Sequence, residues 1–256
     1  MQDYKNIALK NGWAVRSFGP ASSSSDLAKE ALKSGVPEGT AFLVSAQTAG
    51  RGRMGRAWSS EEGDGLYLST CLKPTRPMQD WPSLSFLASL TGVKMVAEAT
   101  GVSADLKWPN DILVNGRKLA GLLLEVSDEA VIIGFGLNLR RAPDLPEAKH
   151  PPIDLSQITE IVPETEKLAE IYLSVLQPLY RLWQDEGPQA ILNKWQAWSD
   201  PTGREMRVSV RESIIEGRCV GLDKQGALIL EAPSGERHII TTGDVQIMGQ
   251  VDAAGH

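Results

Sequence analysis

The sequence predicts an α/β chain, with a large sheet flanked by helices and followed by a small β-rich unit. Apolar runs typical of buried strands alternate with helical periods across residues 13–198. The Asn115-Gly116 pair between two apolar runs indicates a type I′ hairpin, which joins antiparallel strands. Past residues 199–205 the chain changes to short strands with glycine turns. We therefore expect one domain over residues 1–200 and a small β-barrel domain over 201–256.

Each expected element has its own signal. The serines before the helix at 22–35 can cap it, Asp26 suits its first turn and Gly35 ends it. The helix at 164–183 has the strongest amphipathic period. In chain order we expect a first strand at 13–19, a helix at 22–35, strands at 40–48 and 66–73, a helix at 81–101, a hairpin over 105–126, a strand at 130–139, a proline-rich loop at 140–155, helices at 164–183 and 188–197, and strands at 206–210, 215–223, 227–232 and 238–248.

The stretch "GRGRMGRAW", residues 50–58, predicts an anion site on a loop. Its glycines match the spacing of the dinucleotide fingerprint, but no helical period follows, so that interpretation fails. Arginine forks pair with carboxylates and phosphates, and glycines let the backbone approach an anion closely. Arg51, Arg53 and Arg56 repel one another, so we expect the loop to be mobile when empty and ordered by an anionic ligand. An exposed basic loop without function is the alternative.

Composition limits the classes of function. The net charge is -6 and the pI about 5.2, which excludes a broad nucleic-acid footprint and favours a small anion as the target. No P-loop, signal peptide or membrane span is recognisable, so we expect a cytoplasmic protein. Cys71 and Cys219 are interpreted as ordinary thiols. His150, His238 and His256 lack metal-ligand spacing, and we assign no metal to protein side chains.

Two further clusters carry polar residues. "KWPND", 107–111, combines a cation, an aromatic ring, an amide and a carboxylate, although Asn110 and Asp111 could simply bond local backbone groups. Lys118 follows the hairpin turn, where a solvated edge lysine is the plain alternative. In "GFGLN", Gly134 and Gly136 leave room for a bulky group beside the backbone.

The motifs "GRGRMGRAW", "KWPNDI", "RKLAG" and "GFGLNL", in this order and spacing, resemble the biotin protein ligase family. The resemblance implies a mixed, largely antiparallel sheet like that of class II aminoacyl-tRNA synthetases, with an SH3-like C-terminal β-barrel. It implies a ligase that uses ATP with Mg²⁺ to convert biotin to biotinyl-5′-AMP. The biotin then passes to one lysine of a biotin carboxyl carrier domain, as in acetyl-CoA carboxylase. Residues 1–200 would form the catalytic, biotin- and ATP-binding domain.

The same resemblance implies roles for individual residues. Arg53, Lys118 and Asp111 are the implied catalytic side chains, with Asp111 orienting or deprotonating the incoming amine. Where the family has asparagine at the end of a Ser-Thr-Asn triplet, this chain has a serine at position 25. The implied biotin contacts are Ser23, Ser24, Ser25, Gln47, Gly50, Arg51, Gly52, Arg53, Trp58, Lys118 and Gly121. The implied ATP and adenylate contacts are Arg53, Arg56, Asn110, Lys118 and Asn138.

Three alternatives belong to other classes. A lipoate or octanoyl ligase would share the fold, and a catalytically inactive biotin-binding protein would share the site. A bifunctional repressor-ligase would carry a winged helix-turn-helix. Because the pattern begins near residue 13, we expect no such module and no binding of nucleic acid. The resemblance leaves a homodimer and the identity of the carrier protein open.

Overall fold

An eight-stranded sheet forms the centre of the computed structural model, which describes residues 3–127, 129–145, 148, 150–210 and 213–248. Its strand order is β1-β2-β3-β4-β8-β7-β6-β5. The strands are β1 (Tyr4–Ala8), β2 (Ala14–Phe18), β3 (Thr40–Val44), β4 (Gly65–Leu72), β5 (Asp105–Lys107), β6 (Asp111–Val114), β7 (Arg117–Ser127) and β8 (Ala130–Asn138). Among the described strands, only β2 and β3 pair in parallel, and the helix α1 (Ser24–Lys33) connects them. The sheet is therefore mixed and largely antiparallel, as expected.

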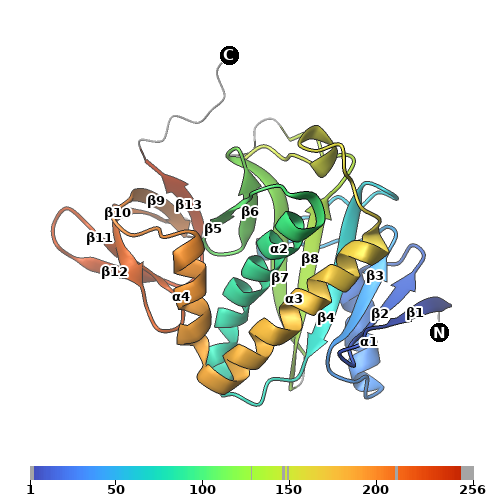
Figure 1. Cartoon of the computed structure of the whole chain (residues 1–256). Coiled ribbons are helices and arrows are strands. Elements are labelled where there is room, and N and C mark those ends of the chain that lie inside the picture. The colour runs from blue at the N-terminus through green and yellow to red at the C-terminus, as the bar shows by residue number, and fades with distance from the viewer. Residues whose placement is uncertain (1–2, 128, 146–147, 149, 211–212, 249–256) are drawn as a thin grey trace.

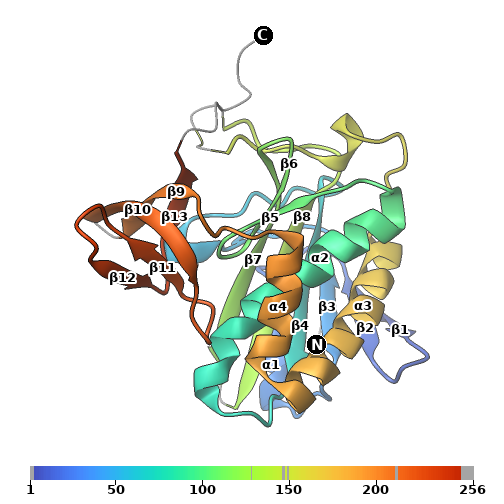
Figure 2. The same cartoon turned by 60° about the vertical axis from the view of Figure 1, so that its left-hand side comes forward.

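Helices cover the sheet unequally. The three helices α2 (Leu84–Thr100), α3 (Thr165–Glu186) and α4 (Pro188–Trp198) lie on one side, and α1 lies on the other (Figures 1 and 2). Tyr172, Trp183 and Trp195 are fully buried in the core on the three-helix side. Because a single helix, α1, covers the other side of the sheet, that side has room for a cavity.

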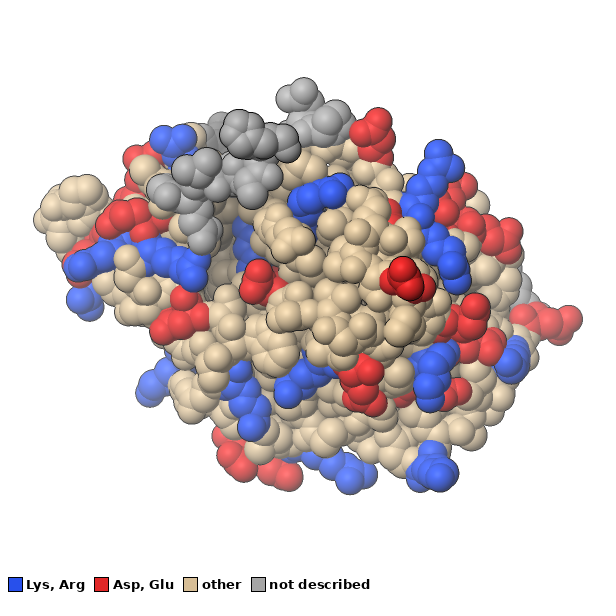
Figure 3. Space-filling model, turned by 45° about the horizontal axis from the view of Figure 1, so that its top comes forward, with Lys and Arg blue, Asp and Glu red and all other residues tan. Residues whose placement is uncertain are grey.

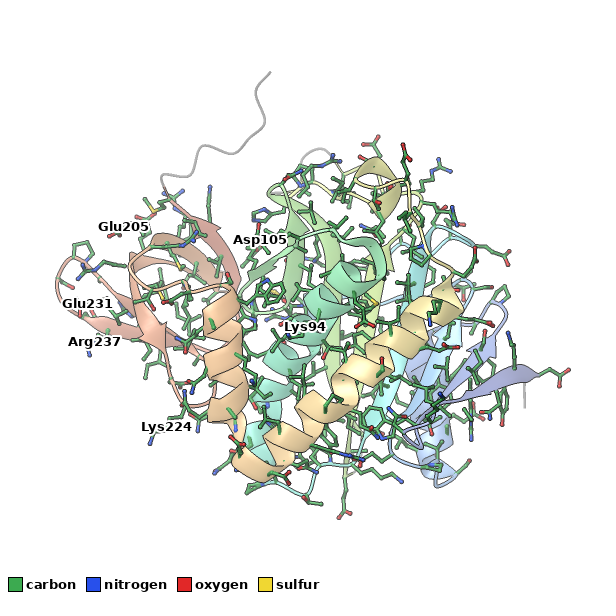
Figure 4. All side chains as sticks on the ribbon, viewed as in Figure 1. Lys94, Asp105, Glu205, Lys224, Glu231 and Arg237 are labelled. Carbon is green, nitrogen blue, oxygen red and sulfur yellow. The ribbon has the colours of Figure 1, made fainter. Side chains whose placement is uncertain are left out.

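A five-stranded antiparallel sheet, here the C-terminal sheet, follows α4. Its order is β12-β11-β10-β9-β13, formed by β9 (Glu205–Val210), β10 (Ser213–Leu222), β11 (Leu228–Glu231), β12 (Arg237–Ile240) and β13 (Asp244–Ile247). The Trp108 indole donates to the carbonyl of Gly226, 2.9 Å away, and so fixes this sheet to the "KWPND" segment. Glu231 and Arg237, labelled in Figure 4, form a 3.0 Å ion pair on adjacent strands of the C-terminal sheet.

The expected elements are mostly confirmed, with two corrections. The strand at 13–19 is not the first, because β1 precedes it, and the run at 238–248 is two strands, β12 and β13, rather than one. The hairpin is confirmed: Asn115 and Gly116 have φ of 52° and 73°, the left-handed pair that a type I′ turn requires. The division into domains at residues 200 and 201 stays a prediction. His256 and residues 146, 147 and 149 of the proline-rich loop lie outside the described residues.

The surface and the buried thiols are ordinary. On the face shown in Figure 3, Lys and Arg side chains are interspersed with Asp and Glu. Cys71 and Cys219 are free and buried, and burial raises the pKa of the Cys71 thiol to about 12. None of the described helices has the length and apolar character needed to cross a bilayer.

Candidate active site

A cavity of about 690 Å³ opens on the α1 side of the large sheet. It extends from the first turn of α1, across β4, β7 and β8, to the turn between β12 and β13. Three regions differ in chemistry. One end is lined by hydroxyl groups, the middle by cations and an aromatic wall, and the far end by the C-terminal sheet.

The hydroxyl end lies where α1 begins. Ser23 caps the helix, and its side chain accepts the Ser25 amide at 3.1 Å. The Ser24 and Ser25 hydroxyls lie 2.8 Å and 2.9 Å from that of Ser69 on β4. Gln47 accepts the Ser24 amide through Oε1 at 2.9 Å. All five residues line the cavity, which therefore ends in a connected polar cluster.

The cationic middle is built by Lys118 and Arg53. Lys118 Nζ lies 2.7 Å from Asp111 Oδ1, and only 29% of the lysine side chain is exposed. Arg53 donates to Asn110 Oδ1 at 2.8 Å, while the Asn110 amide donates to the Leu122 carbonyl at 2.6 Å. Because β7 lies between β8 and β6, the interpretation of Lys118 as a solvated edge lysine is wrong.

Trp58 forms a wall against glycines of the sheet. A Cβ on Gly136 would lie 2.6 Å from the Trp58 ring, and one on Gly121 would lie 3.0 Å from it. A Cβ on Gly134 would approach the Ser25 hydroxyl at 3.4 Å. The prediction that a glycine leaves room for a bulky group is confirmed for Gly136, which lies against the Trp58 ring, whereas the Gly134 position faces only the small Ser25 side chain and Leu123. Lys118 Nζ lies 5.6 Å from the centroid of the same indole.

The other arginines of the loop contact acids. Arg51 makes a bidentate contact with Asp26, with a shortest distance of 2.6 Å. The hydrogen bond from Arg51 holds the pKa of Asp26 below its usual value, and the same bond raises the pKa of Arg51. Arg56 lies 3.6 Å from Asp244 of the C-terminal sheet. Arg51 and Arg56 therefore each have an acidic partner, which offsets the repulsion among the arginines expected from the sequence. The mobility of the empty loop stays a prediction.

Arg53 is the least exposed of the three arginines in the loop. Its second terminal nitrogen donates to Thr242 Oγ1, so the residue bridges the large sheet and the C-terminal sheet. Burial lowers the pKa of Arg53 from its ordinary value, and the guanidinium remains a cation at neutral pH. Asn138, at the end of β8, uses its amide to donate to the Ile153 carbonyl at 3.1 Å. This bond ties the strand end to the proline-rich loop.

The cavity gathers nearly all the predicted site residues, Gly50 excepted. A Cβ on Gly50 would lie 2.5 Å from the Trp58 carbonyl, so this glycine serves the packing of the loop rather than the lining. Sequence reasoning missed Ser69, Gly243 and Asp244 in the lining; a serine inside the apolar run "LYLSTCL" is the one usable signal. The predicted residues that line the cavity are Ser23, Ser24, Ser25, Gln47, Arg51, Gly52, Arg53, Arg56, Trp58, Asn110, Asp111, Lys118, Gly121 and Asn138.

Family models match both parts of the chain. Residues 19–138 match the biotin/lipoate A/B protein ligase family, and residues 203–248 match the biotin protein ligase C terminal domain. The bifunctional ligase/repressor BirA of Bacillus subtilis is 36% identical over 88% of this chain and 71% of its own length. The biotin--[acetyl-CoA-carboxylase] ligase of Mycobacterium tuberculosis is 32% identical over 88% of this chain and 85% of its own.

Solved structures agree with the sequence matches. The biotin protein ligase from Aquifex aeolicus in complex with biotin and ATP superimposes with a TM-score of 0.79, at 26% identity, over 91% of this chain and 98% of that one. The fold is that of an enzyme class that joins carboxylic acids to proteins. The chain belongs to the biotin protein ligase family.

Proposed function

We propose that this protein is a ligase that activates biotin with ATP and attaches it to a lysine of a carrier protein. One observation carries the proposal: Lys118, Arg53 and Asn110 converge in the middle of a cavity that is lined by hydroxyl groups at one end. The relative from Aquifex aeolicus binds biotin and ATP, and the relative from Mycobacterium tuberculosis is named for acetyl-CoA carboxylase. The carrier is accordingly a biotin carboxyl carrier domain.

The first half-reaction joins two anions. A carboxylate oxygen of biotin attacks the α-phosphorus of ATP, the bond to the β-phosphate breaks, and pyrophosphate leaves. At about 4 Å and an effective dielectric near 20, the repulsion between two charges is roughly 4 kcal/mol. Lys118 and Arg53 offset it by binding the approaching oxygens in a partly buried site. Asn110 holds the Arg53 guanidinium in place.

The second half-reaction releases AMP. The carrier lysine attacks the acyl carbon of biotinyl-5′-AMP, an amide bond forms, and the bond from that carbon to the phosphate oxygen breaks. Asp111 lies beside the reacting centre through its contact with Lys118 and receives or orients the amine proton. No described side chain is needed as a covalent nucleophile, because the mixed anhydride is already activated.

Magnesium belongs to the proposal as a companion of ATP. Among the described residues there is no group of three or more His, Cys, Asp or Glu side chains that could hold a metal ion. The phosphates of ATP would bring the ion into the cavity, and Asp111, the acidic side chain of the lining nearest Lys118, would be available to help hold it. When bound, Mg²⁺ neutralises charge on those phosphates.

We also propose a cytoplasmic location, where ATP is available and unpaired thiols such as Cys71 stay reduced.

The direct test is a reconstitution. The purified protein, ATP, Mg²⁺, biotin and a biotin carboxyl carrier domain are incubated, and the carrier is weighed by mass spectrometry. We expect one biotinyl group on a single lysine and release of pyrophosphate. Parallel reactions contain lipoate or octanoate in place of biotin. Modification with these acids alone would replace the proposal with a lipoyl or octanoyl ligase, and biotin binding without adenylate would indicate an inactive binding protein.

A further inference from the structure

A second acidic side chain lies within reach of Arg51. Arg51 Nη2 donates to Asp26 Oδ1 at 2.6 Å and also lies 3.7 Å from Glu125 Oε2. Asp26 is in the first turn of α1, whereas Glu125 is on β7 of the large sheet. The guanidinium at the start of the loop at residues 50–58 therefore lies between carboxylates from two different elements.

The Glu125 carboxylate uses only one of its oxygens in a hydrogen bond. Glu125 Oε1 accepts from Lys29 Nζ at 2.7 Å, but Oε2 is buried and accepts no hydrogen bond from the described residues. Only 19% of the Glu125 side chain is exposed, against 39% for Asp26. A buried carboxylate oxygen without a hydrogen bond is unfavourable, and a guanidinium nitrogen is a donor that suits it. Glu125 therefore attracts Arg51 from the less exposed side.

Arg51 fixes one end of a short hairpin. It pairs with Ala57 in an antiparallel bridge, which closes the base of the hairpin. In such an extended arm, residues i and i+2 point to the same side. Arg51 approaches Glu125 on β7, and two residues further on Arg53 donates to Asn110 between β5 and β6 at 2.8 Å. The position of Arg53 over the cavity thus depends on how firmly Arg51 is held.

We propose that Glu125 is a positioning residue, which holds Arg51 together with Asp26 and so sets the position of Arg53 for the ligand. This inference rests on the proposed function and deepens it. A single, partly exposed ion pair holds a long side chain weakly, whereas several charges in one network hold it better. The plain alternative is that Glu125 serves only its bond with Lys29, which fastens α1 to the sheet.

The test separates the two partners of Glu125. The KM for biotin and the release rate of biotinyl-5′-AMP are measured for wild type, Glu125→Gln, Arg51→Ala and the double variant. The matched control is Lys29→Met, which breaks the ion pair with Glu125 and leaves both acids beside Arg51. Glu125→Asp keeps the charge but withdraws the carboxylate, and it serves if Glu125→Gln fails to fold. Melting temperatures are recorded for every variant.

We expect Glu125→Gln to raise both the KM for biotin and the adenylate release rate by about three- to fivefold, the scale of one partly exposed ion pair. The kcat for adenylation should stay nearly unchanged. In the Arg51→Ala background the same substitution should have no further effect, and Lys29→Met should resemble wild type. An equal effect of Glu125→Gln with and without Arg51, or its full reproduction by Lys29→Met, would overturn the inference.

A second readout does not depend on the reaction. Trypsin should cut within residues 50–60 of the ligand-free protein faster in Glu125→Gln than in wild type or Lys29→Met, because one acid fewer holds the start of the loop. Unchanged cleavage in Glu125→Gln would contradict the positioning role alone. Wild-type protein that forms no biotinyl-5′-AMP would instead overturn the proposed function.

Discussion

Lys118 shows how much a single side chain depends on its strand. Directly after a hairpin turn, a lysine is usually solvated, but here the neighbouring strands β6 and β8 enclose it. Its ammonium meets the Asp111 carboxylate at 2.7 Å and the face of Trp58 at 5.6 Å. A compact cation in such surroundings is held in position before any anion arrives.

Replacing Lys118 should impair both half-reactions. We expect Lys118→Ala to weaken biotin binding and to raise each barrier by about 2–4 kcal/mol, the scale for loss of one preorganised donor. Lys118→Arg should rescue poorly, because a planar fork does not occupy the place of an ammonium. Single-turnover adenylation and transfer rates measure both effects. The control is Arg117→Ala, which removes an adjacent cation whose guanidinium donates to the Pro152 carbonyl, 2.6 Å away. If Lys118→Ala forms the adenylate and transfers biotin at wild-type rates, Lys118 is not part of the active site.

Arg53→Ala should reduce both formation and retention of the adenylate. The guanidinium is partly buried and has two described partners, Asn110 and Thr242, so its position is fixed. Charge-assisted hydrogen bonds from such a group contribute on the order of 1.5–3 kcal/mol each. The release rate of biotinyl-5′-AMP, followed by rapid gel filtration, reports retention. If the variant makes and holds adenylate like wild type, the anion site lies elsewhere.

At the scale of elements, the arginine loop is attached to acidic side chains at two points. Arg51 reaches Asp26 on α1, and Arg56, with 69% of its side chain exposed, reaches Asp244. We expect trypsin to cut within residues 50–60 of the ligand-free protein and to be blocked by biotin with ATP. Asp26→Asn should speed cleavage without ligand, because Arg51 loses its bidentate partner. Equal cleavage with and without ligand would contradict ordering by the anion.

Gly136 of β8 and Gly121 of β7 set the position of the Trp58 wall. Gly136→Ala would place a Cβ 2.6 Å from the indole, so the ring must move. We expect a raised KM for biotin, with a smaller change in melting temperature. The control is Gly19→Ala, since a Cβ on Gly19 meets nothing within 4 Å. A KM equal to that of wild type would mean that Trp58 does not bound the biotin cavity.

The sequence predicted elements better than it predicted contacts between them. Strong apolar periods and the Asn115-Gly116 turn act locally, so the helices and the hairpin were found. The strand β1 was missed because its burial pattern is mostly exposed and gives no apolar period. Motif spacing located the predicted site residues, but Ser69 and Asp244 lie in other segments and reach the cavity only through the strand order and the docking of the C-terminal sheet. Apart from the serine inside the apolar run "LYLSTCL", such long-range placement has no local signal.

At the scale of the whole molecule, the two sheets meet at the cavity. Asp244 lies 3.6 Å from both Arg56 and Lys107, and Trp108 donates to Gly226. We expect Asp244→Asn to raise the KM for ATP, because the loop loses an anchor on the C-terminal sheet. Adenylation kinetics at several ATP concentrations measure the effect. Glu231→Gln is the control, since it breaks the ion pair with Arg237 away from the cavity (Figure 4). An equal increase in the KM for ATP in both variants would indicate that the C-terminal sheet is generally destabilised.

The contact of Arg53 with Thr242 has an energetic consequence. On the proposed function, Arg53 binds the substrate and also joins the two sheets, so it couples occupancy of the cavity to cohesion of the molecule. Linkage is reciprocal, so whatever free energy the ligand gains from a docked C-terminal sheet, the sheet gains from the ligand. Biotin and ATP should therefore slow amide hydrogen exchange in β12 and β13. Hydrogen exchange in the C-terminal sheet would then report on ligand binding at the large sheet.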